Sequence, residues 1–121
     1  MRGYLFNRPL LFSVFLALVI LFVAATADAA SVITSKPAFA AGEPIVVQFA
    51  DFPGHSSDWI NVVPAGSPAT AWGDWKYTQG TQSGFMNFNG QPSGDYEVRG
   101  YFNYSGTGSY AIQARYRFSV R

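Results

Sequence analysis

Hydrophobic and polar positions alternate with a period of two along most of the chain beyond residue 30. The clearest examples are residues 95–103 and residues 110–121. Such alternation puts successive side chains on opposite faces of a β-strand. A strand with one apolar and one polar face is typical of antiparallel sheets that cover a core on one side. The positions expected to face inward are Tyr96, Val98, Gly100 and Phe102 in the first segment, and Ile112, Ala114, Tyr116, Phe118 and Val120 in the second.

Residues that favour turns, chiefly glycine and proline, divide this part of the chain into short segments. Clusters of such residues are typical of the connections between strands. No helical period appears outside the N-terminal segment. The pattern predicts an all-β fold, an immunoglobulin-like antiparallel β-sandwich of about seven strands. The expected strands are residues 31–36, 44–50, 58–64, 70–78 with an irregularity at Gly73, 83–89, 95–103 and 110–121.

The last two segments are expected to form a hairpin with a glycine-rich connection. If its turn centres near residues 105–106, Glu97 lies opposite Arg115 and Asp95 lies near Arg117. Cross-strand pairs of opposite charge contribute roughly 0.2–1 kcal/mol each. The alternation therefore predicts two ion pairs on the outer face of this hairpin.

Residues 1–29 differ in character from the rest of the chain. Arg2 and Arg8 precede an apolar run at residues 9–25, and small residues follow it. A basic start, an apolar run and an Ala-x-Ala exit are typical of a secretory signal peptide. We therefore expect a signal-peptide helix cleaved after residue 29, followed by one domain at residues 30–121.

The alternative for the N-terminal segment is an uncleaved membrane anchor, because its apolar run is long for a signal peptide. Contact with a membrane is expected only in that case. Both interpretations place the domain outside the cytoplasm, either secreted or periplasmic.

The charge of the expected domain argues against one class of partner. Residues 30–121 carry as many acidic as basic side chains. Proteins that bind nucleic acid gain affinity by neutralising phosphates with clustered Lys and Arg. We therefore expect no nucleic-acid partner.

The chain also contains no cysteine, which excludes thiol catalysis, thiolate metal sites and disulfide bonds.

Four short motifs stand out in the expected domain. They are Gly-Glu-Pro-Ile at 42–45, Asp-Trp-Ile at 58–60, Trp-Lys-Tyr-Thr-Gln-Gly at 75–80 and Ser-Gly-Asp-Tyr-Glu-Val-Arg at 93–99. Together they resemble a known class of immunoglobulin-like modules found beside hydrolase or peptidase domains in secreted bacterial proteins, and the eukaryotic SKICH domain is similar. The resemblance covers about residues 36–120 and implies a non-catalytic accessory module. It also implies that Tyr96 forms a tyrosine corner, with its phenol bonded to main chain.

Catalytic and metal chemistry have few candidates. The single histidine, His55, lies three residues before Asp58 in one loop, whereas a catalytic triad draws its groups from separate elements. One histidine without cysteine does not make an ordinary zinc site. Asp51, Asp58 and Asp74 offer oxygen ligands for calcium but lack EF-hand spacing, and Asp58 has the simpler role of capping its loop. We assign no catalytic residue, metal or cofactor.

Aromatic residues make up 17% of the chain, more than a thin core needs. Most of them, Trp59, Trp75, Tyr77, Tyr96 and Tyr116, are expected in the core or at a corner. Others are expected to point outward or to occupy a hairpin tip, where rigid apolar rings suit sugars and protein partners. Together with polar neighbours of the same parity, the predicted binding residues are Trp72, Asp74, Arg99, Tyr101 and Tyr104.

These observations favour an exported, non-catalytic binding or adhesion module that recognises carbohydrate or protein through outward aromatic residues and loops. The alternative is an accessory subunit of a separate secreted enzyme, which would dock by addition at a sheet edge.

Overall fold

The computed structural model describes residues 29–121 of the chain. The expected signal peptide at residues 1–29 lies outside the described residues except for its last position, so it stays a prediction. In the described part, no helix is long and apolar enough to cross a membrane.

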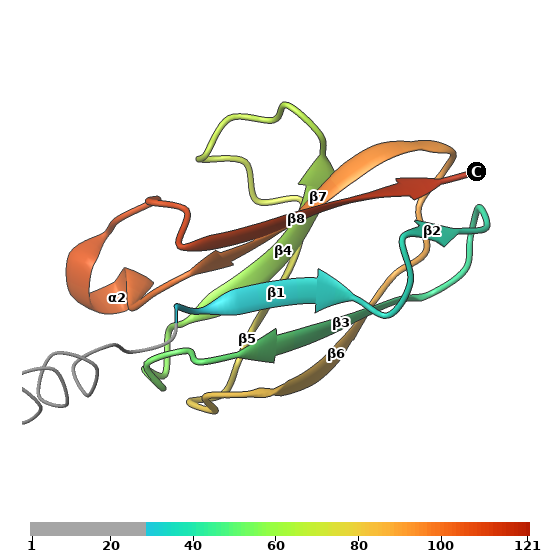
Figure 1. The fold of residues 1–121 in the computed structure, drawn as a ribbon. Helices are drawn as coiled ribbons and strands as arrows, with labels where there is room; N and C mark the ends of the chain where they lie inside the picture. The colour runs from blue at the N-terminus through green and yellow to red at the C-terminus, as the bar shows by residue number, and fades with distance from the viewer. Residues whose placement is uncertain (1–28) are drawn as a thin grey trace, which may run out of the picture.

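The described chain is all-β, as predicted, and its strands form two sheets (Figure 1). One sheet has three strands in the order β1-β3-β6, and the other has five in the order β2-β8-β7-β4-β5. The arrangement is compatible with a β-sandwich. The strands are β1 (Ser31–Thr34), β2 (Ala38–Phe39), β3 (Ile45–Ala50), β4 (Trp59–Pro64), β5 (Asp74–Tyr77), β6 (Gly84–Phe88), β7 (Gly94–Tyr101) and β8 (Ala114–Val120), with one helical turn, α2 (Tyr104–Thr107).

The first predicted strand is divided between the two sheets. β1 pairs with β3 in an antiparallel manner, and the chain then crosses at Pro37, which ends the first ladder because it lacks an N–H donor. β2 pairs in parallel with the last residues of β8. A strand of two residues has too short an alternation to be recognised in the sequence, so it was not predicted.

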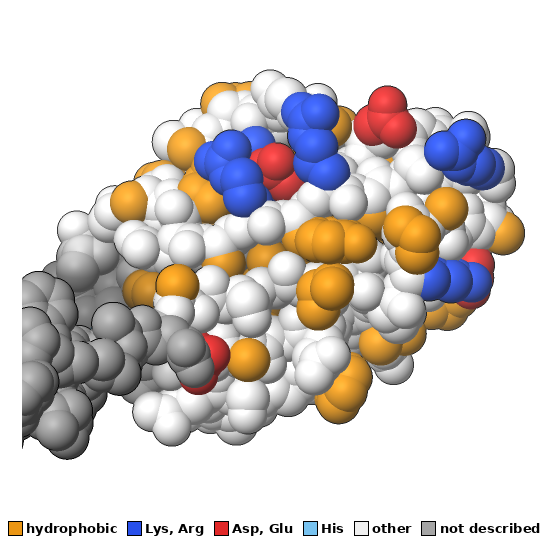
Figure 2. Space-filling view, in the orientation of Figure 1, with side chains coloured by type: hydrophobic (Ala, Val, Ile, Leu, Met, Phe, Trp, Pro, Cys, Tyr) orange, Lys and Arg blue, Asp and Glu red, His pale blue; other side chains and the backbone are white. Residues whose placement is uncertain are grey.

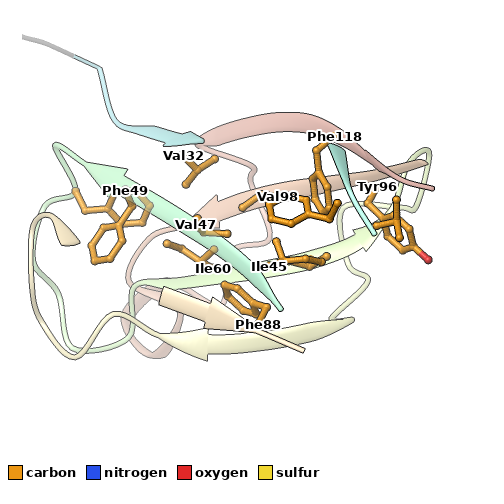
Figure 3. Packing of buried hydrophobic residues seen from close by; sticks show 13 residues of the cluster. Val32, Ile45, Val47, Phe49, Ile60, Phe88, Tyr96, Val98 and Phe118 are labelled. Atoms are coloured by element: carbon orange, nitrogen blue, oxygen red, sulfur yellow. The ribbon is translucent and has the colours of Figure 1, made fainter. Parts of the chain in front are cut away.

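The core lies between the two sheets (Figure 3). The alternating positions of β3, β4, β7 and β8 point into it, and each large apolar side chain buried there contributes about 1.5–3 kcal/mol. Tyr96 closes one end: its ring stacks on Phe118 with centroids 5.8 Å apart, and its hydroxyl donates to the carbonyl of Pro92 at 2.7 Å. This main-chain bond is the one expected for Tyr96. The buried cluster comprises Val32, Phe39, Ile45, Val47, Phe49, Phe52, Ile60, Val62, Phe88, Tyr96, Val98, Phe118 and Val120.

The predicted register of the last hairpin is wrong by two residues. Glu97 pairs with Arg117, and Arg99 pairs with Arg115. The reason is that the connection is not a tight turn, because it contains α2 and continues without regular structure until β8 begins. Glu97 therefore bonds Arg99 on its own strand at 2.6 Å and approaches the exposed Arg117 at 3.9 Å.

Charged side chains on the visible surface lie in mixed-sign groups. In Figure 2, the Lys and Arg side chains lie beside acidic ones, and hydrophobic atoms form scattered patches between them. One such pair joins Lys36 to Glu43, and this pairing lowers the pKa of Glu43. Exposed pairs of this kind contribute little to stability.

Candidate functional site

An open pocket with a volume of about 120 Å³ lies beside β4 and β5. We call it the aromatic pocket, because every side chain that lines it is a tryptophan or a tyrosine. Its residues come from three parts of the chain: the strand pair β4–β5, the loop before β5, and the connection between β7 and β8. They are Trp59, Trp72, Trp75, Tyr77, Tyr104 and Tyr110.

The pair β4–β5 supplies the floor of the aromatic pocket. Trp59 pairs with Tyr77, and Trp75 lies two pairs along the ladder, opposite Asn61. Residues paired across antiparallel strands point to the same face, so these rings lie on the face away from the core. Trp59 is buried and stacks on Tyr101, with centroids 4.1 Å apart and planes 9° apart. Trp75 meets Trp59 edge-on at 6.2 Å. The floor is therefore held by ring packing.

Asp58 positions the connection that carries Tyr104 and Tyr110. Its carboxylate is fully buried. One oxygen accepts the backbone N–H of Asn103 at 2.9 Å. The other accepts the N–H groups of Gly54 and His55 at 3.1 and 3.0 Å. Charge-assisted bonds to backbone N–H are among the stronger hydrogen bonds of proteins. The carboxylate thus joins two loops, which extends its expected role of capping its own loop.

Ser57 adds a second tie between the same two loops. Its carbonyl accepts the N–H of Tyr104 at 3.2 Å, and its hydroxyl oxygen accepts the N–H of Ser105 at 3.0 Å. The helical turn α2 is therefore fixed at its first residues, and Tyr104 is held at the edge of the aromatic pocket.

Two residues predicted to contact a ligand are buried instead. Arg99 is 3% exposed and Tyr101 is 0% exposed, so the prediction that they lie on an open surface is wrong. They do lie on the face away from the core, but the loop at residues 65–73 covers that face. Tyr101 donates its hydroxyl to the carbonyl of Ala69 at 2.8 Å. The side chain therefore supports both this loop and the ring of Trp59.

Arg99 fastens the same loop through its guanidinium. It donates to the carbonyls of Ser67 and Pro68 at 2.6 and 2.8 Å, and to the carboxylate of Glu97 at 2.6 Å. Burial lowers the pKa of Arg99, but its contacts with Glu97 and Tyr101 outweigh that effect and keep the pKa above its usual value. The buried charge is compensated on several sides, which is what its burial requires.

The end of the loop at residues 65–73 delivers Trp72 to the aromatic pocket. Asn61 donates to the carbonyl of Ala71 at 2.9 Å. Gly73 follows Trp72 with a φ of +58°, and a Cβ there would lie 2.3 Å from the carbonyl oxygen of Val62. Only glycine combines this conformation with such a close approach to β4. Trp72 is consequently held at the rim, where it is 59% exposed.

A short hydrogen-bond chain joins the rim residues of the aromatic pocket. The indole N–H of Trp72 donates to the hydroxyl of Tyr110 at 3.0 Å, and the phenols of Tyr110 and Tyr104 share a bond of 3.3 Å. The hydrogen bonds that Tyr110 shares with Tyr104 and Trp72 lower the pKa of Tyr110. The bond to Tyr110 raises the pKa of Tyr104. The N–H of Trp72 and the O–H of Tyr110 are therefore both used within the rim.

One polar atom in the floor has no such partner. The indole nitrogen of Trp59 is buried, and no acceptor among residues 29–121 lies within hydrogen-bonding distance of it. An unpaired buried donor of this kind costs about 1–3 kcal/mol.

The predicted binding residues therefore separate into two groups. Trp72 and Tyr104 line the aromatic pocket, whereas Arg99 and Tyr101 lie beneath the loop. Asp74 does neither, because its carboxylate accepts the N–H of Asn89 at 3.0 Å. It ties the start of β5 to the end of β6.

The sequence analysis missed several pocket residues. Trp75 and Tyr77 were expected in the core or at a corner, but each is 41% exposed, so a core position is wrong for them. The two residues are two positions apart on one strand, and this shared parity could have indicated an outer aromatic face. Tyr110 was missed because β8 was expected to begin there, whereas it begins at Ala114.

Metal ligands are not gathered in the part of the chain that the structure describes. Among residues 29–121, no three His, Asp or Glu side chains lie close enough together to hold an ion. The three aspartates weighed as calcium ligands, Asp51, Asp58 and Asp74, are thus not brought together. His55 contacts Asp58 through its backbone N–H.

We compared the chain with protein-family models, curated proteins and solved structures, and none of the three comparisons gave a match.

Proposed function

We propose that this chain is an exported, non-catalytic binding module with an immunoglobulin-like fold, and that it holds its ligand in the aromatic pocket. The observation that carries the proposal is the exposure of three neighbouring rings. Trp72, Trp75 and Tyr77 are 59%, 41% and 41% exposed and line one pocket. Single exposed rings are ordinary, but clustered ones are typical of interaction sites.

The immunoglobulin-like assignment is supported by the strand order. The first segment is shared between the sheets; of the later strands, β3 and β6 belong to the three-stranded sheet, and β4, β5, β7 and β8 belong to the five-stranded sheet. The bond from Tyr96 to the carbonyl of Pro92 is the tyrosine corner typical of such sandwiches. Export rests on the sequence pattern of residues 1–29.

Binding is further supported by the way the rings are held. A buried carboxylate, a buried guanidinium and a glycine of left-handed conformation fix the loops that carry Tyr104 and Trp72. Pre-organised aromatic side chains lose little entropy when a ligand binds. The ligand we expect is a carbohydrate or a group on a partner protein that offers an apolar face to these rings.

The test is an NMR titration of the purified protein with a panel of soluble glycans and small amphiphilic molecules. We expect saturable shifts at the pocket residues, abolished by Trp75→Ala and preserved in Phe85→Ala, which removes an exposed ring from the other sheet. Shifts that map away from the pocket would overturn the assignment of the site.

A second candidate function, an accessory subunit of a secreted enzyme, is favoured by a different surface. On the outer face of the three-stranded sheet, Ile33 and Phe85 flank Gln48 in register and are 44% and 71% exposed. Phe85→Ser should then abolish partner capture from the secreted fraction of the source, whereas Trp75→Ala should leave it intact.

The edge of β6 is less suited to strand addition. Lys76 bonds the carbonyl of Asn87, and Asp74 accepts the N–H of Asn89. These side chains occupy backbone groups that an added strand would need. Docking would therefore use the exposed sheet face rather than this edge.

A further inference from the structure

The rings of the aromatic pocket lie in several planes. Trp75 is inclined by 79° to Trp59 and by 78° to Tyr77, and Tyr110 is inclined by 90° to Trp59 and by 62° to Tyr104. Stacking of a sugar ring needs a flat aromatic face. Rings at these angles instead surround a small volume from different directions, as the walls of a cage do.

The polar groups that a sugar would need are scarce in the lining. It contains no carboxylate, amide or cationic side chain. The indole N–H of Trp72 and the hydroxyls of Tyr104 and Tyr110 already bond one another. The unpaired indole N–H of Trp59 adds one donor in the floor, which is too few for the several hydroxyl groups of a sugar. Most of those hydroxyl groups would lose their water without gaining a partner, which is unfavourable.

A methylated ammonium group fits the same lining better. The faces of aromatic rings carry partial negative charge and attract cations, most strongly in tryptophan. A quaternary ammonium has no N–H that requires an acceptor, and its methyl groups match an apolar wall. The volume of about 120 Å³ accommodates a compact group of this kind.

Two basic side chains of the five-stranded sheet, Lys76 on β5 and Arg99 on β7, do not oppose a cation in the pocket. Lys76 follows Trp75 in the chain but points to the opposite face of β5, where its ammonium lies over the ring of Phe88 at 5.4 Å. The charge of Arg99 is compensated by Glu97. The lining itself contains no Lys or Arg.

We infer that the aromatic pocket binds a quaternary ammonium group of the trimethylammonium type. The inference rests on the proposed function, because it names the chemical class of ligand for the same pocket. The six aromatic side chains supply cation–π attraction and apolar contact, and Trp75 is the exposed tryptophan of the floor.

The experiment is a fluorescence and NMR titration of the purified protein at constant ionic strength with choline chloride, tetramethylammonium chloride and 3,3-dimethylbutan-1-ol. The alcohol is the neutral carbon analogue of choline. We expect both cations to bind saturably, with choline at least about tenfold tighter than the alcohol, since several cation–π contacts of this kind act together. Equal binding of choline and the alcohol, or no binding of either cation, would overturn the inference.

Single substitutions test whether choline binds in the aromatic pocket. Trp75→Ala should weaken choline binding about tenfold or more, and Trp75→Phe should weaken it less because a ring remains. Tyr110→Phe should change it little, and Phe85→Ala should leave it unchanged. If Trp75→Ala fails to fold, Trp75→Phe carries the test, and undiminished binding by that variant would contradict the role of the indole.

A further arm separates the sources of such a group. Co-sedimentation with phosphatidylcholine vesicles, competed by choline, would indicate a lipid headgroup, and binding of free choline alone would indicate a soluble or polymer-attached ligand. Both results support the inference. If a glycan binds the pocket and the cations do not, the inference fails and the proposed function stands. If all shifts map outside the pocket, both fail.

Discussion

The two faces of the five-stranded sheet are buried in different ways. Its inner face packs against the three-stranded sheet through apolar side chains such as Ile60 and Val98. Its outer face is covered in part by the loop at residues 65–73, which is held by hydrogen bonds from Arg99 and Tyr101. The inner face is stabilised mainly by removal of apolar area from water. The cover of the outer face is stabilised by hydrogen bonds from Arg99 and Tyr101 to individual carbonyl groups of the loop. The loop does not cover the aromatic pocket, which stays open to solvent beside it.

The outer side of this sheet shows that polar side chains on one face of a strand can be buried. Glu97, Arg99 and Asn61 have the composition of an exposed surface, yet all three are at most 4% exposed. Buried polar groups on a covered face need hydrogen-bond partners. Arg99 and Glu97 have them, whereas Asn61 Oδ1 has no partner among residues 29–121. The need for partners makes this face more sensitive to single changes than its composition suggests.

The largest expected effect is on the inner face. Phe88→Ala removes a ring that is 2% exposed and should lower the free energy of unfolding by about 3–5 kcal/mol through lost burial and a cavity. Urea denaturation measures it. Phe85→Ala, on the same strand but 71% exposed, is the matched control and should change stability by about 0.5 kcal/mol or less. Similar losses in both variants would contradict the assignment of the two faces.

On the outer face, Arg99→Met should cost a comparable amount, about 3 kcal/mol or more, because it leaves Glu97 buried and uncompensated. It also removes the donors for two loop carbonyls. The double variant Glu97→Gln/Arg99→Met should recover part of the loss in the same denaturation assay. A loss in the single variant below about 1 kcal/mol, the range of an exposed pair, would show that the face is open.

Gly73→Ala should lower stability by roughly 2 kcal/mol, since it combines an unfavourable φ with contact against the carbonyl of Val62. Displacement of Trp72 should also alter the tryptophan fluorescence. Gly66→Ala is the control: its φ is +86° but nothing lies within 4 Å of the added Cβ, so about 1 kcal/mol is expected. If both variants lose the same free energy of unfolding, the close approach of Gly73 to β4 contributes nothing measurable to stability.

Tyr101→Phe should have a smaller effect, about 1 kcal/mol, because only the bond to the carbonyl of Ala69 is lost while the stacking on Trp59 remains. Thermal unfolding checks the stability, and hydrogen exchange at residues 65–73 checks the loop. Faster exchange confined to those residues is the expected signature, and a uniform increase over the whole domain would argue against a local role.

The smallest effect concerns proton binding at the rim. The lowered pKa of Tyr110 adds stability above the ordinary tyrosine pKa that is lost as the pH falls through the folded value. The raised pKa of Tyr104 acts in the opposite sense, with its contribution lost as the pH rises through its folded value. The net stability therefore changes little, but the phenols should titrate separately, Tyr110 first.

Ultraviolet difference titration measures this separation. Trp72→Phe removes the indole donor and should raise the pKa of Tyr110 toward the ordinary value. An unchanged titration in that variant would mean that the bond from Trp72 does not hold the rim together.

The site was partly predictable from the sequence. Trp72 and Tyr104 were assigned from parity and from a hairpin position, and both line the aromatic pocket. Trp75 and Tyr77 were placed in the core or at a corner because large rings are usually buried. The sequence pattern does not indicate that β5 is an edge strand whose outer face is uncovered.

The alternation of apolar and polar residues was enough to predict which side chains share a strand face. Side-chain direction follows from the local backbone, so alternation alone identified the inward residues Val98 and Phe118 and the all-β class. What covers each face could be learned only from the folded structure. The bonds that hold the loop over Arg99 and Tyr101 join residues 31 and 32 positions apart. No local pattern encodes contacts at that separation, because they depend on how a connection without regular structure settles on a completed sheet.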